Sequence, residues 1–294
     1  MKRLKYLPFA MLFVLALLFH FGASSLLIHP IQRSPDTSEV QRIIDQESAK
    51  FSPLSIQSGK VKLSGYFAVQ EKTNDKTVVI LHGVGGVSTD LKKELSLFLD
   101  AGYNVAALDA RAHGNSEGGF CTYGYHEVSD YSMLLNELEK KFGQKKFAIY
   151  GHSMGAAVAV QCAASDDRFK ALLAFAPFKN LEDVSLEYMD RLFGFRSTFL
   201  NTWMLWAAEC RADFNSEDVS PEESAKKVNC PTLIAHGLKD VHIPLSHAEA
   251  IHKQIKHPSK YFVPIEEANH VSLWSNGGRQ LEVQVLNLLQ EGWE

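Results

Sequence analysis

Hydrophobic and polar residues alternate with two different periods along most of this chain. Short apolar runs rich in β-branched residues, at positions 77–81, 104–108 and 146–150, predict strands that are buried on both faces. Longer segments between them, such as residues 125–142, repeat apolar residues every three or four positions and predict amphipathic helices. Strands and helices that alternate in this way predict an α/β fold with a mostly parallel, doubly wound sheet.

The same alternation continues through the second half of the chain with one interruption. The later predicted elements are strands at residues 171–174, 231–235 and 260–264 and helices at residues 246–255 and 280–290. Between Phe178 and Asn229 the pattern changes to helical stretches rich in Trp, Phe, Met and Leu. A helical insert beside the ligand-binding end of a sheet often forms a lid, so we expect a short helical lid insert at about residues 178–218. Most of its aromatic residues are expected to pack its inner face.

The first 29 residues carry a different pattern. Residues 1–5 are basic, residues 6–32 contain no Asp, Glu, Lys or Arg, and residues 7–21 are almost wholly apolar. This layout is typical of a secretory signal peptide, with the small residues 22–25 as a cleavage region, and also of a signal-anchor helix. The uncharged stretch continues through Ile28, which favours the anchor. In both interpretations the following domain is membrane-anchored or exported and lies on the non-cytoplasmic side.

Residues 30–58 are polar and mixed, and we interpret them as a linker or N-terminal extension with a helical stretch near residues 38–50. Apolar and polar residues then alternate over much of residues 59–69, which predicts an antiparallel strand at the start of the folded domain. We therefore expect one α/β domain over residues 59–294, preceded by the linker and by an N-terminal hydrophobic helix over residues 1–29.

Composition narrows the classes to which this chain can belong. Its 294 residues are 46% hydrophobic and 22% charged, with a net charge of −4, which is ordinary for a soluble enzyme domain. No basic patch stands out beyond the N-terminus, so we expect no nucleic acid as a partner. The four cysteines form no CxxC pair and no Cys/His cluster with zinc spacing, so we expect no metal site. A disulfide remains open if the domain is exported.

The segment Gly151-His-Ser-Met-Gly155 carries the first chemical signal. It follows a predicted strand and precedes a helical run of small residues, which is the setting of a Gly-x-Ser-x-Gly nucleophile elbow. The glycines permit a tight turn, and the serine then stands at a helix N-terminus, which favours developing negative charge. We predict that Ser153 is a catalytic nucleophile; a Gly/Ser-rich turn without chemistry is the alternative.

A serine nucleophile needs a base, and the base needs an acid that orients it. Asp240 follows the predicted strand at 231–235, and His270 follows the predicted strand at 260–264. Both therefore lie at the carboxyl ends of parallel strands, where open α/β sheets bind ligands. Nucleophile, acid and base also come in the chain order of the α/β-hydrolase triad. We predict that Asp240 and His270 complete a catalytic triad with Ser153.

Acyl transfer also needs backbone N–H groups that stabilise an oxyanion. The residue after the nucleophile, Met154, supplies one, and the glycine-rich loop His82-Gly-Val-Gly-Gly86 supplies the other through Val84. A nucleotide phosphate loop is the alternative for these glycines, but the lysine of a P-loop and the spacing of a dinucleotide fingerprint are missing. We expect His82, Gly83 and His152 to line the site.

These residues together resemble the α/β-hydrolase fold superfamily, from about residue 59 to the C-terminus. The matching pieces are His82-Gly83, Asp109-x-Arg111-x-His113-Gly114-x-Ser116, Gly151-His-Ser-Met-Gly155, residues 231–237 with Asp240, and Asn269-His270. The resemblance is strongest to the branch of serine esterases, monoacylglycerol-lipase-like enzymes and serine aminopeptidase-like enzymes. It implies no metal and no organic cofactor, and it identifies no substrate, because function resides in the site rather than in the fold.

The sequence leaves three functions open. The first is a serine hydrolase that cleaves a small-molecule, lipid or acylglycerol carboxylic ester through an acyl-enzyme on Ser153. The second is a serine peptidase or amidase with the same triad; the insert shows no obvious acidic pair for a substrate amine, although Glu182, Asp183 and Glu187 leave this function open. The third is a non-catalytic binding protein on the same scaffold, which the complete triad disfavours. The aromatic insert and the apolar N-terminal segment favour an ester hydrolase that lies beside a membrane.

Overall fold

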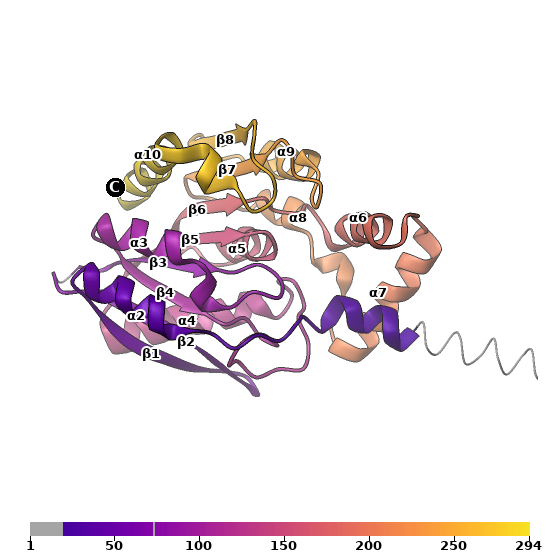
Figure 1. The fold of residues 1–294 in the computed structure, drawn as a ribbon, viewed down its shortest axis with the longest axis horizontal. Helices are drawn as coiled ribbons and strands as arrows, with labels where there is room; N and C mark the ends of the chain where they lie inside the picture. Colours follow the sequence, from indigo (N-terminus) through magenta and orange to yellow (C-terminus); the bar gives the residue numbers. More distant parts are fainter. Residues whose placement is uncertain (1–19, 73) are drawn as a thin grey trace, which may run out of the picture.

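The computed structural model describes residues 20–72 and 74–294, in which eight strands form a single twisted sheet (Figure 1). Their order across the sheet is β1-β2-β4-β3-β5-β6-β7-β8. Strand β2 is antiparallel to both of its neighbours, and all pairings from β4 to β8 are parallel. The strands are β1 (Ala49–Ser58), β2 (Val61–Gln70), β3 (Lys76–Leu81), β4 (Asn104–Leu108), β5 (Lys146–His152), β6 (Phe169–Phe175), β7 (Thr232–Gly237) and β8 (Lys260–Ile265). The mostly parallel sheet confirms the predicted α/β fold.

Helices cover both faces of the sheet and bury their apolar stripes against it. Leu134 of α4, Val158 of α5 and Ile251 of α9 belong to one hydrophobic core. Phe98 of α3 and Val285 of α10 belong to the core on the other face. The helices of these two layers are α2 (Thr37–Gln46), α3 (Lys92–Asp100), α4 (Glu127–Phe142), α5 (Met154–Ser165), α8 (Pro221–Ala225), α9 (Leu245–Gln254) and α10 (Leu273–Trp293). Because both faces are covered, the central strands are buried throughout, as their continuous apolar runs predicted.

The predicted strands and helices between residues 77 and 290 all occur, and most of their ends differ from the prediction by only one or two residues. The largest difference is at α10, which begins at Leu273 instead of residue 280. Gly278, with φ 51° and ψ −149°, kinks this helix near its start. The kink separates the first turn from the regular apolar repeat, which explains why the repeat alone predicted a shorter helix.

The predicted linker at residues 30–58 requires correction, because it contains regular structure that belongs to the domain. Helix α2 ends before the predicted stretch does, and residues 49–58 form β1, which pairs with β2 along its whole length. Leu54 and Ile56 are buried, while polar residues alternate with them. Pro53 is tolerated because β1 lies at the edge of the sheet, where a missing N–H breaks no ladder. The folded domain therefore begins before residue 59.

Two helices from the predicted insert, α6 (Leu181–Phe193) and α7 (Thr198–Ala212), project to one side of the sheet (Figure 1). Residues 20–28, which we call the N-terminal helix, lie beside α7. None of the helices in the described ranges is both long enough and apolar enough to cross a membrane. Most of the predicted signal or anchor segment falls on residues 1–19, which lie outside the described residues.

Candidate active site

The predicted nucleophile, Ser153, lies in a sharp turn between β5 and α5. Its backbone angles, φ 58° and ψ −120°, are ones that residues other than glycine rarely adopt. The Ser153 N–H donates to the carbonyl oxygen of Phe175 at 2.8 Å, which ties the turn to β6. The turn therefore has the strand–turn–helix geometry of a nucleophile elbow, with the serine at the N-terminus of α5.

Two glycines permit this turn because they have no side chain. A Cβ atom on Gly151 would lie 2.1 Å from the carbonyl oxygen of Gly155, and one on Gly155 would lie 2.3 Å from that of Leu81. Both distances are far shorter than van der Waals contact allows. The glycines thus set how closely the turn, the first residues of α5 and the end of β3 approach one another.

The structure brings His270 and Asp240 to Ser153, although His270 is 117 residues away in the chain. The Ser153 Oγ–H donates to His270 Nε2 at 2.9 Å, and the His270 Nδ1–H donates to Asp240 Oδ2 at 2.6 Å. Asp240 follows β7 and His270 follows β8, so two strand ends deliver them. In this arrangement an imidazole can take the serine proton while a carboxylate stabilises the resulting imidazolium.

Main-chain groups fix the Asp240 carboxylate. The N–H groups of His242 and Ile243 donate to Asp240 Oδ1 at 2.8 and 3.0 Å, which leaves Oδ2 for His270. The ring of His236 lies 3.5 Å from Oδ2, but its Nε2–H donates to the carbonyl oxygen of Ile243 at 2.8 Å. Burial lowers the pKa of His236, so this ring is neutral near pH 7. The negative charge of Asp240 is therefore directed at His270.

The two predicted oxyanion donors, Val84 and Met154, border the same cavity as the serine. Met154 is the first residue of α5, and Val84 follows Gly83, on which a Cβ would lie 3.4 Å from the Ser153 Cβ. Neither the Val84 N–H nor the Met154 N–H donates to an acceptor within residues 20–72 and 74–294. An N–H in the first turn of a helix has no partner inside that helix. Both groups thus remain available to an oxygen atom of a ligand.

Buried histidines hold the glycine-rich loop in place. The His82 Nδ1–H donates to the carbonyl oxygen of Gly83 at 2.8 Å, and His82 Nε2 accepts the N–H of Ala110 at 3.0 Å. His113 Nε2 accepts the Gly85 N–H at 3.1 Å. Burial and the neighbouring His113 lower the pKa of His82 to about 4, and burial lowers the pKa of His113. Each neutral ring offers one donor and one acceptor, which is what the loop requires.

The three residues predicted to line the site, His82, Gly83 and His152, lie close to Ser153 but line a different groove. They border this separate groove with Trp274. The His152 Nε2–H donates to the carbonyl oxygen of His270 at 2.7 Å, and burial lowers the pKa of His152 to about 4. The two histidine side chains thus bond to loops of the site, and Gly83 lies against Ser153, although none of the three lines the apolar cavity beside the Ser153 hydroxyl.

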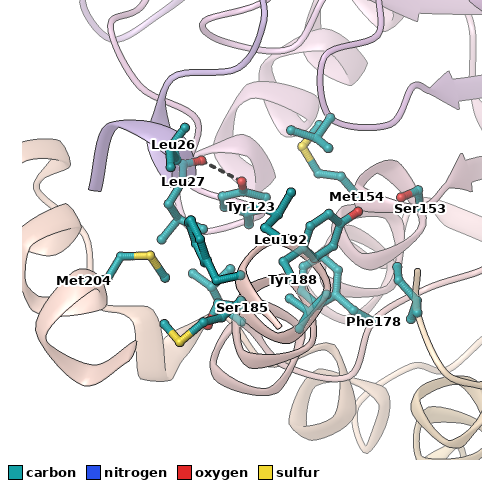
Figure 2. Close-up of a pocket in the computed structure, with 16 residues that line it drawn as sticks. Leu26, Leu27, Tyr123, Ser153, Met154, Phe178, Ser185, Tyr188, Leu192 and Met204 are labelled. Carbon is teal, nitrogen blue, oxygen red and sulfur yellow. Dashed lines mark hydrogen bonds between the residues drawn. The ribbon is translucent and has the colours of Figure 1, made fainter. Parts of the chain in front are cut away.

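That space is an apolar cavity of about 160 Å³, which extends from Ser153 into the lid (Figure 2). Val84 and Met154 border it near the serine, and Leu192 of α6 and Met204 of α7 border it farther out. Other residues that line it include Phe178, Val184, Tyr188 and Ile243. Pockets for organic ligands are mostly apolar, with a few polar groups that fix orientation. Ser153 is one of the few polar residues here, so the cavity suits a hydrocarbon group placed next to the serine.

Leu26 and Leu27 also line this cavity, and sequence reasoning missed both. They lie in the apolar stretch whose composition predicts a targeting segment, and that prediction gives them no role in the site. The uncharged stretch continues past the small residues at 22–25, but this pattern favours an anchor and does not identify site residues. Tyr123 was missed too, since its position depends on a loop with a left-handed backbone, φ 56°, that periodicity does not predict.

No metal centre is evident in the described part of the chain. Over residues 20–72 and 74–294, no group of three or more His, Cys, Asp and Glu side chains is placed to hold a metal ion. All four cysteines are unpaired; three are buried and Cys210 is exposed.

Known proteins share this fold and parts of this sequence. Residues 72–221, about half of the chain, match the family model described as serine aminopeptidase, S33. The uncharacterized protein YqkD of Bacillus subtilis is 30% identical over 212 residues, which are 68% of this chain and 67% of that protein. The lysophosphatidylserine lipase ABHD12 of Danio rerio is 27% identical over 180 residues, or 59% of this chain. The chain spans only 45% of the length of that lipase.

A solved structure of an esterase has the same fold. The esterase Pf2001 of Pyrococcus furiosus superposes with a TM-score of 0.72 over 89% of this chain and 98% of the esterase. The two sequences are 21% identical, so the likeness shows the fold and not the substrate.

Proposed function

Since the chain belongs to the serine aminopeptidase S33 family of α/β hydrolases, we propose that it is a serine hydrolase that cleaves a carboxylic ester through an acyl-enzyme on Ser153. The apolar cavity that begins at the Ser153 hydroxyl is the observation that carries this proposal. A triad can attack many acyl groups, but a cavity lined by leucine, methionine and phenylalanine side chains favours a hydrocarbon acyl group. Esters of fatty acids, including lipid and acylglycerol esters, have such a group.

The proposed reaction begins when Ser153 Oγ attacks the carbonyl carbon and its proton passes to His270 Nε2. Asp240 keeps the imidazole oriented and stabilises its positive charge. The N–H groups of Val84 and Met154 donate to the oxyanion of the tetrahedral intermediate. The ester C–O bond then breaks, and the alcohol leaves with the proton from His270. A water molecule that gives a proton to His270 releases the acid and restores Ser153.

A peptidase or amidase is the alternative, because the matching family model is described as serine aminopeptidase, S33. An aminopeptidase needs an acidic group for the substrate amine. Of the three carboxylates that the insert offers, Glu182 is exposed, and the other two have cationic partners. Asp183 is paired with Lys179 at 2.7 Å, and Glu187 is paired with Arg196 at 2.6 Å. Because both carboxylates already have cationic partners, they are poorly suited to bind a substrate amine. This favours the ester hydrolase.

A substrate panel tests the proposal. We expect the purified full chain to hydrolyse p-nitrophenyl esters of C2 to C12 acids faster than aminoacyl p-nitroanilides. Ser153→Ala should lower kcat by roughly a millionfold, as loss of a serine nucleophile does in another serine hydrolase. Ser165→Ala, at the far end of α5, serves as the matched control and should retain activity. Turnover by Ser153→Ala at the wild-type rate would refute the nucleophile, and a preference for anilides would favour the peptidase.

We further propose that the hydrolase domain lies on the non-cytoplasmic side of a membrane, either tethered or exported. The basic residues 1–5 and the apolar run at residues 7–21 support this orientation. Protease added to intact cells should then digest the domain, whereas a domain that is digested only after lysis would contradict the orientation.

A further inference from the structure

We propose that the N-terminal helix is part of the substrate site, where it forms the far wall of an acyl-chain subsite and limits the length of chain that the enzyme accepts. This inference rests on the proposed ester hydrolysis and deepens it by naming the residues that select the acyl group. The segment that sequence alone assigned to targeting would thus also determine specificity.

The position of two leucines carries the inference. Leu26 and Leu27 line the same cavity as Ser153, but at its opposite end (Figure 2). Leu192 of α6 lies between them in this view, and Met204 of α7 borders the cavity at the end where the two leucines lie. An acyl group bound to Ser153 would therefore point along the cavity toward the N-terminal helix. Without that helix, the cavity would lose the wall that Leu26 and Leu27 form and would open more widely to solvent at this end.

Hydrogen bonds fix this wall to the hydrolase domain. The Tyr123 hydroxyl donates to the carbonyl oxygen of Leu27 at 2.6 Å, as Figure 2 shows. The Cys121 N–H donates to the carbonyl oxygen of Ile28 at 2.9 Å, and the Ile28 side chain is fully buried in the core. A segment that only tethered the domain would need neither a buried side chain nor main-chain bonds to the loop beside the site.

Arg211 of α7 joins the same helix to the lid. Its guanidinium donates to the carbonyl oxygen of Phe21 at 3.0 Å and to the hydroxyl oxygens of Ser24 and Ser25 at 2.6 and 2.9 Å. It also lies over the ring of Phe21, 5.6 Å from the ring centre. One side chain of the lid thus holds one full turn of the N-terminal helix. Cleavage at residues 22–25 would remove Phe21 and part of this contact, so we infer that the helix is retained in the active enzyme.

The size of the cavity limits the acyl group. A protein cavity of about 150 Å³ holds one benzene molecule, so a cavity of this size encloses about six carbons. Leu26 is 70% exposed and Leu192 is 60% exposed, which places the outer end of the cavity at the protein surface. A longer chain would have to leave the cavity between these residues. We therefore expect the best substrates to be esters of acids with about six to eight carbons, with longer chains accepted less well.

Substitution at the wall tests the inference. Leu27→Trp should fill the outer end of the cavity, so kcat/KM for C6 and C8 p-nitrophenyl esters should fall about tenfold or more while the C2 ester changes little. One methylene in a hydrophobic pocket changes such ratios by roughly ten- to 200-fold. Leu27→Ala should instead shift the optimum toward longer chains. Val283→Trp adds the same ring at a half-exposed position of α10 and controls for effects of the tryptophan itself.

Release of the helix is the second test. Arg211→Ala should lower the ratio of C8 to C2 activity about tenfold, because the outer wall then no longer excludes water from the chain. Arg196→Ala is the matched control, since Arg196 is a lid arginine that pairs with Glu187 and Asp190 and makes no ion pair with the N-terminal helix in the described residues. Equal chain-length profiles for wild type, Leu27→Trp and Arg211→Ala would overturn the inference.

Two further measurements separate this inference from the proposed function. A fluorophosphonate should label Ser153 in every wall variant, which would show that the variants are folded and that the triad works. If labelling persists but substitution of Leu27 does not change the chain-length profile, the proposed wall is refuted and the proposed serine hydrolase activity is not. If wild type is neither labelled nor active on esters, the proposed function fails first. Mass spectrometry of the mature protein should find an N-terminus before residue 20, and a fully active form that begins after Leu27 would also overturn the wall.

Discussion

At the residue scale, the candidate site is a chain of hydrogen bonds from Asp240 through His270 to Ser153. In the first two residues, one polar atom of the side chain is occupied, and the other faces the next residue of the chain. Main-chain N–H groups occupy one oxygen of Asp240, so the other oxygen faces His270. The Nδ1–H of His270 then faces Asp240, so its Nε2 is free to accept the Ser153 hydroxyl. The order of these contacts sets the tautomer of His270, and the tautomer sets the function of the site.

Asp240→Asn tests this dependence. The amide can donate a hydrogen bond where the carboxylate only accepts, so it favours the wrong tautomer of His270 and removes the charge that stabilises the imidazolium. We expect kcat for a short ester to fall on the order of 10⁴-fold with little change in the fold, as in another Ser-His-Asp enzyme. Steady-state kinetics and circular dichroism check the two parts. An Asp240→Asn enzyme with nearly normal kcat would place the acid elsewhere.

Gly155→Ala tests the packing of the elbow. The new methyl group would lie 2.3 Å from the carbonyl oxygen of Leu81 and would force α5 away from β3. Over-packing of this kind typically costs 1–3 kcal/mol, and a clash with backbone allows less relief, so we expect a loss of about 3 kcal/mol in the free energy of unfolding. Urea denaturation measures it. Gly143→Ala, at a position with nothing near its Cβ but with φ +66°, should cost only about 1 kcal/mol. Equal stability of the Gly155→Ala protein and wild type would contradict the close packing.

Sequence alone predicted the triad at this scale because each member has a local signal. The elbow glycines surround Ser153, and Asp240 and His270 each follow a strand. The supporting contacts have no such signal. The bonds that join His82 to Ala110 and His113 to Gly85 each link residues 28 positions apart, and no periodicity in the chain indicates which loop a histidine will face.

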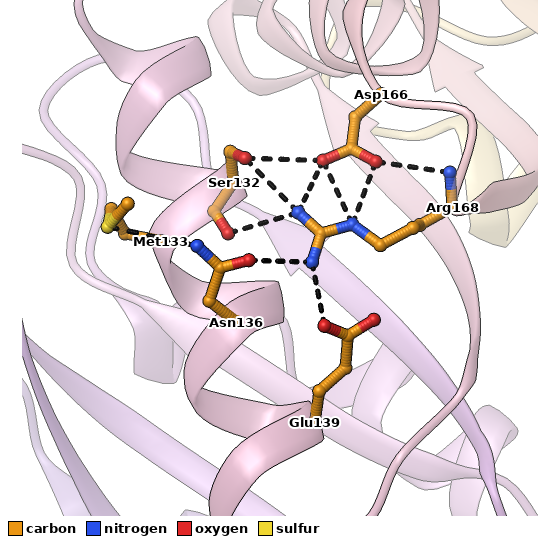
Figure 3. A network of polar contacts seen from close by, with 6 residues as sticks. All are labelled: Ser132, Met133, Asn136, Glu139, Asp166 and Arg168. Carbon is orange, nitrogen blue, oxygen red and sulfur yellow. Dashed lines mark hydrogen bonds and ion pairs between the residues drawn. The ribbon is translucent and has the colours of Figure 1, made fainter.

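At the element scale, the helices are joined by polar networks as well as by the cores. Arg168, just before β6, lies between Asp166 and one face of α4 (Figure 3). It donates to Asp166 at 2.6 Å, to Asn136 at 2.8 Å, to Glu139 at 3.0 Å and to the Ser132 hydroxyl at 3.1 Å. The side chain is only 27% exposed, so these bonds are partly shielded from water. The network ties α4 to the turn between α5 and β6.

Arg168→Ala should therefore destabilise the domain without changing the catalytic activity of the folded protein. Loss of hydrogen bonds that involve charged groups typically costs 1.5–3 kcal/mol, so we expect about 2 kcal/mol less unfolding free energy in urea. Turnover per folded molecule should be unchanged. Arg42→Ala is the matched control, because Arg42 pairs with Glu39 at the exposed surface and such pairs contribute less than about 1 kcal/mol. If both variants lose the same stability, the network has no special role.

The elements that sequence missed are those whose pattern is ambiguous. β1 is rich in serine and contains Pro53, so it lacks the apolar run of a central strand and was assigned to a linker. The N-terminal helix has an apolar run that suits a membrane segment as well as a protein surface. Its contacts with Tyr123 and Arg211 and the buried side chain of Ile28 show that residues 20–28 pack against the domain.

At the scale of the whole molecule, buried neutral histidines make stability depend on pH. Burial lowers the pKa of His82 to about 4, and His152 and His247 are lowered to about 4 mainly for the same reason. In the unfolded chain these groups bind a proton near pH 6.5. Between pH 6.5 and 4 the unfolded state therefore binds more protons, and the free energy of unfolding falls as the pH is lowered.

We expect this loss to be measurable by urea denaturation between pH 7 and pH 5. A single histidine with these two pKa values accounts for about 2 kcal/mol over that interval. His82→Gln keeps an amide near the loop but removes the titrating ring, so its stability should fall less steeply with decreasing pH. A stability that is constant or rises from pH 7 to pH 5 would show that these rings are not buried as neutral groups.

The overall architecture was predictable because strand and helix periods are local, and their alternation allows few topologies. The family comparison and the observed sheet confirm that prediction. The cavity was not predictable, since its walls come from the glycine-rich loop, the lid and the N-terminal helix together. Which acyl group the molecule accepts is thus a property of the assembled fold and not of any one motif.

The most direct measurement of the central claim is reaction of the full chain with a fluorophosphonate, followed by peptide mass spectrometry. The account predicts one phosphonylated residue, Ser153, with labelling abolished in Ser153→Ala and strongly slowed in His270→Ala, while ester turnover is lost in parallel with labelling. Labelling at a different serine, or ester turnover that persists after Ser153 is fully modified, would contradict it.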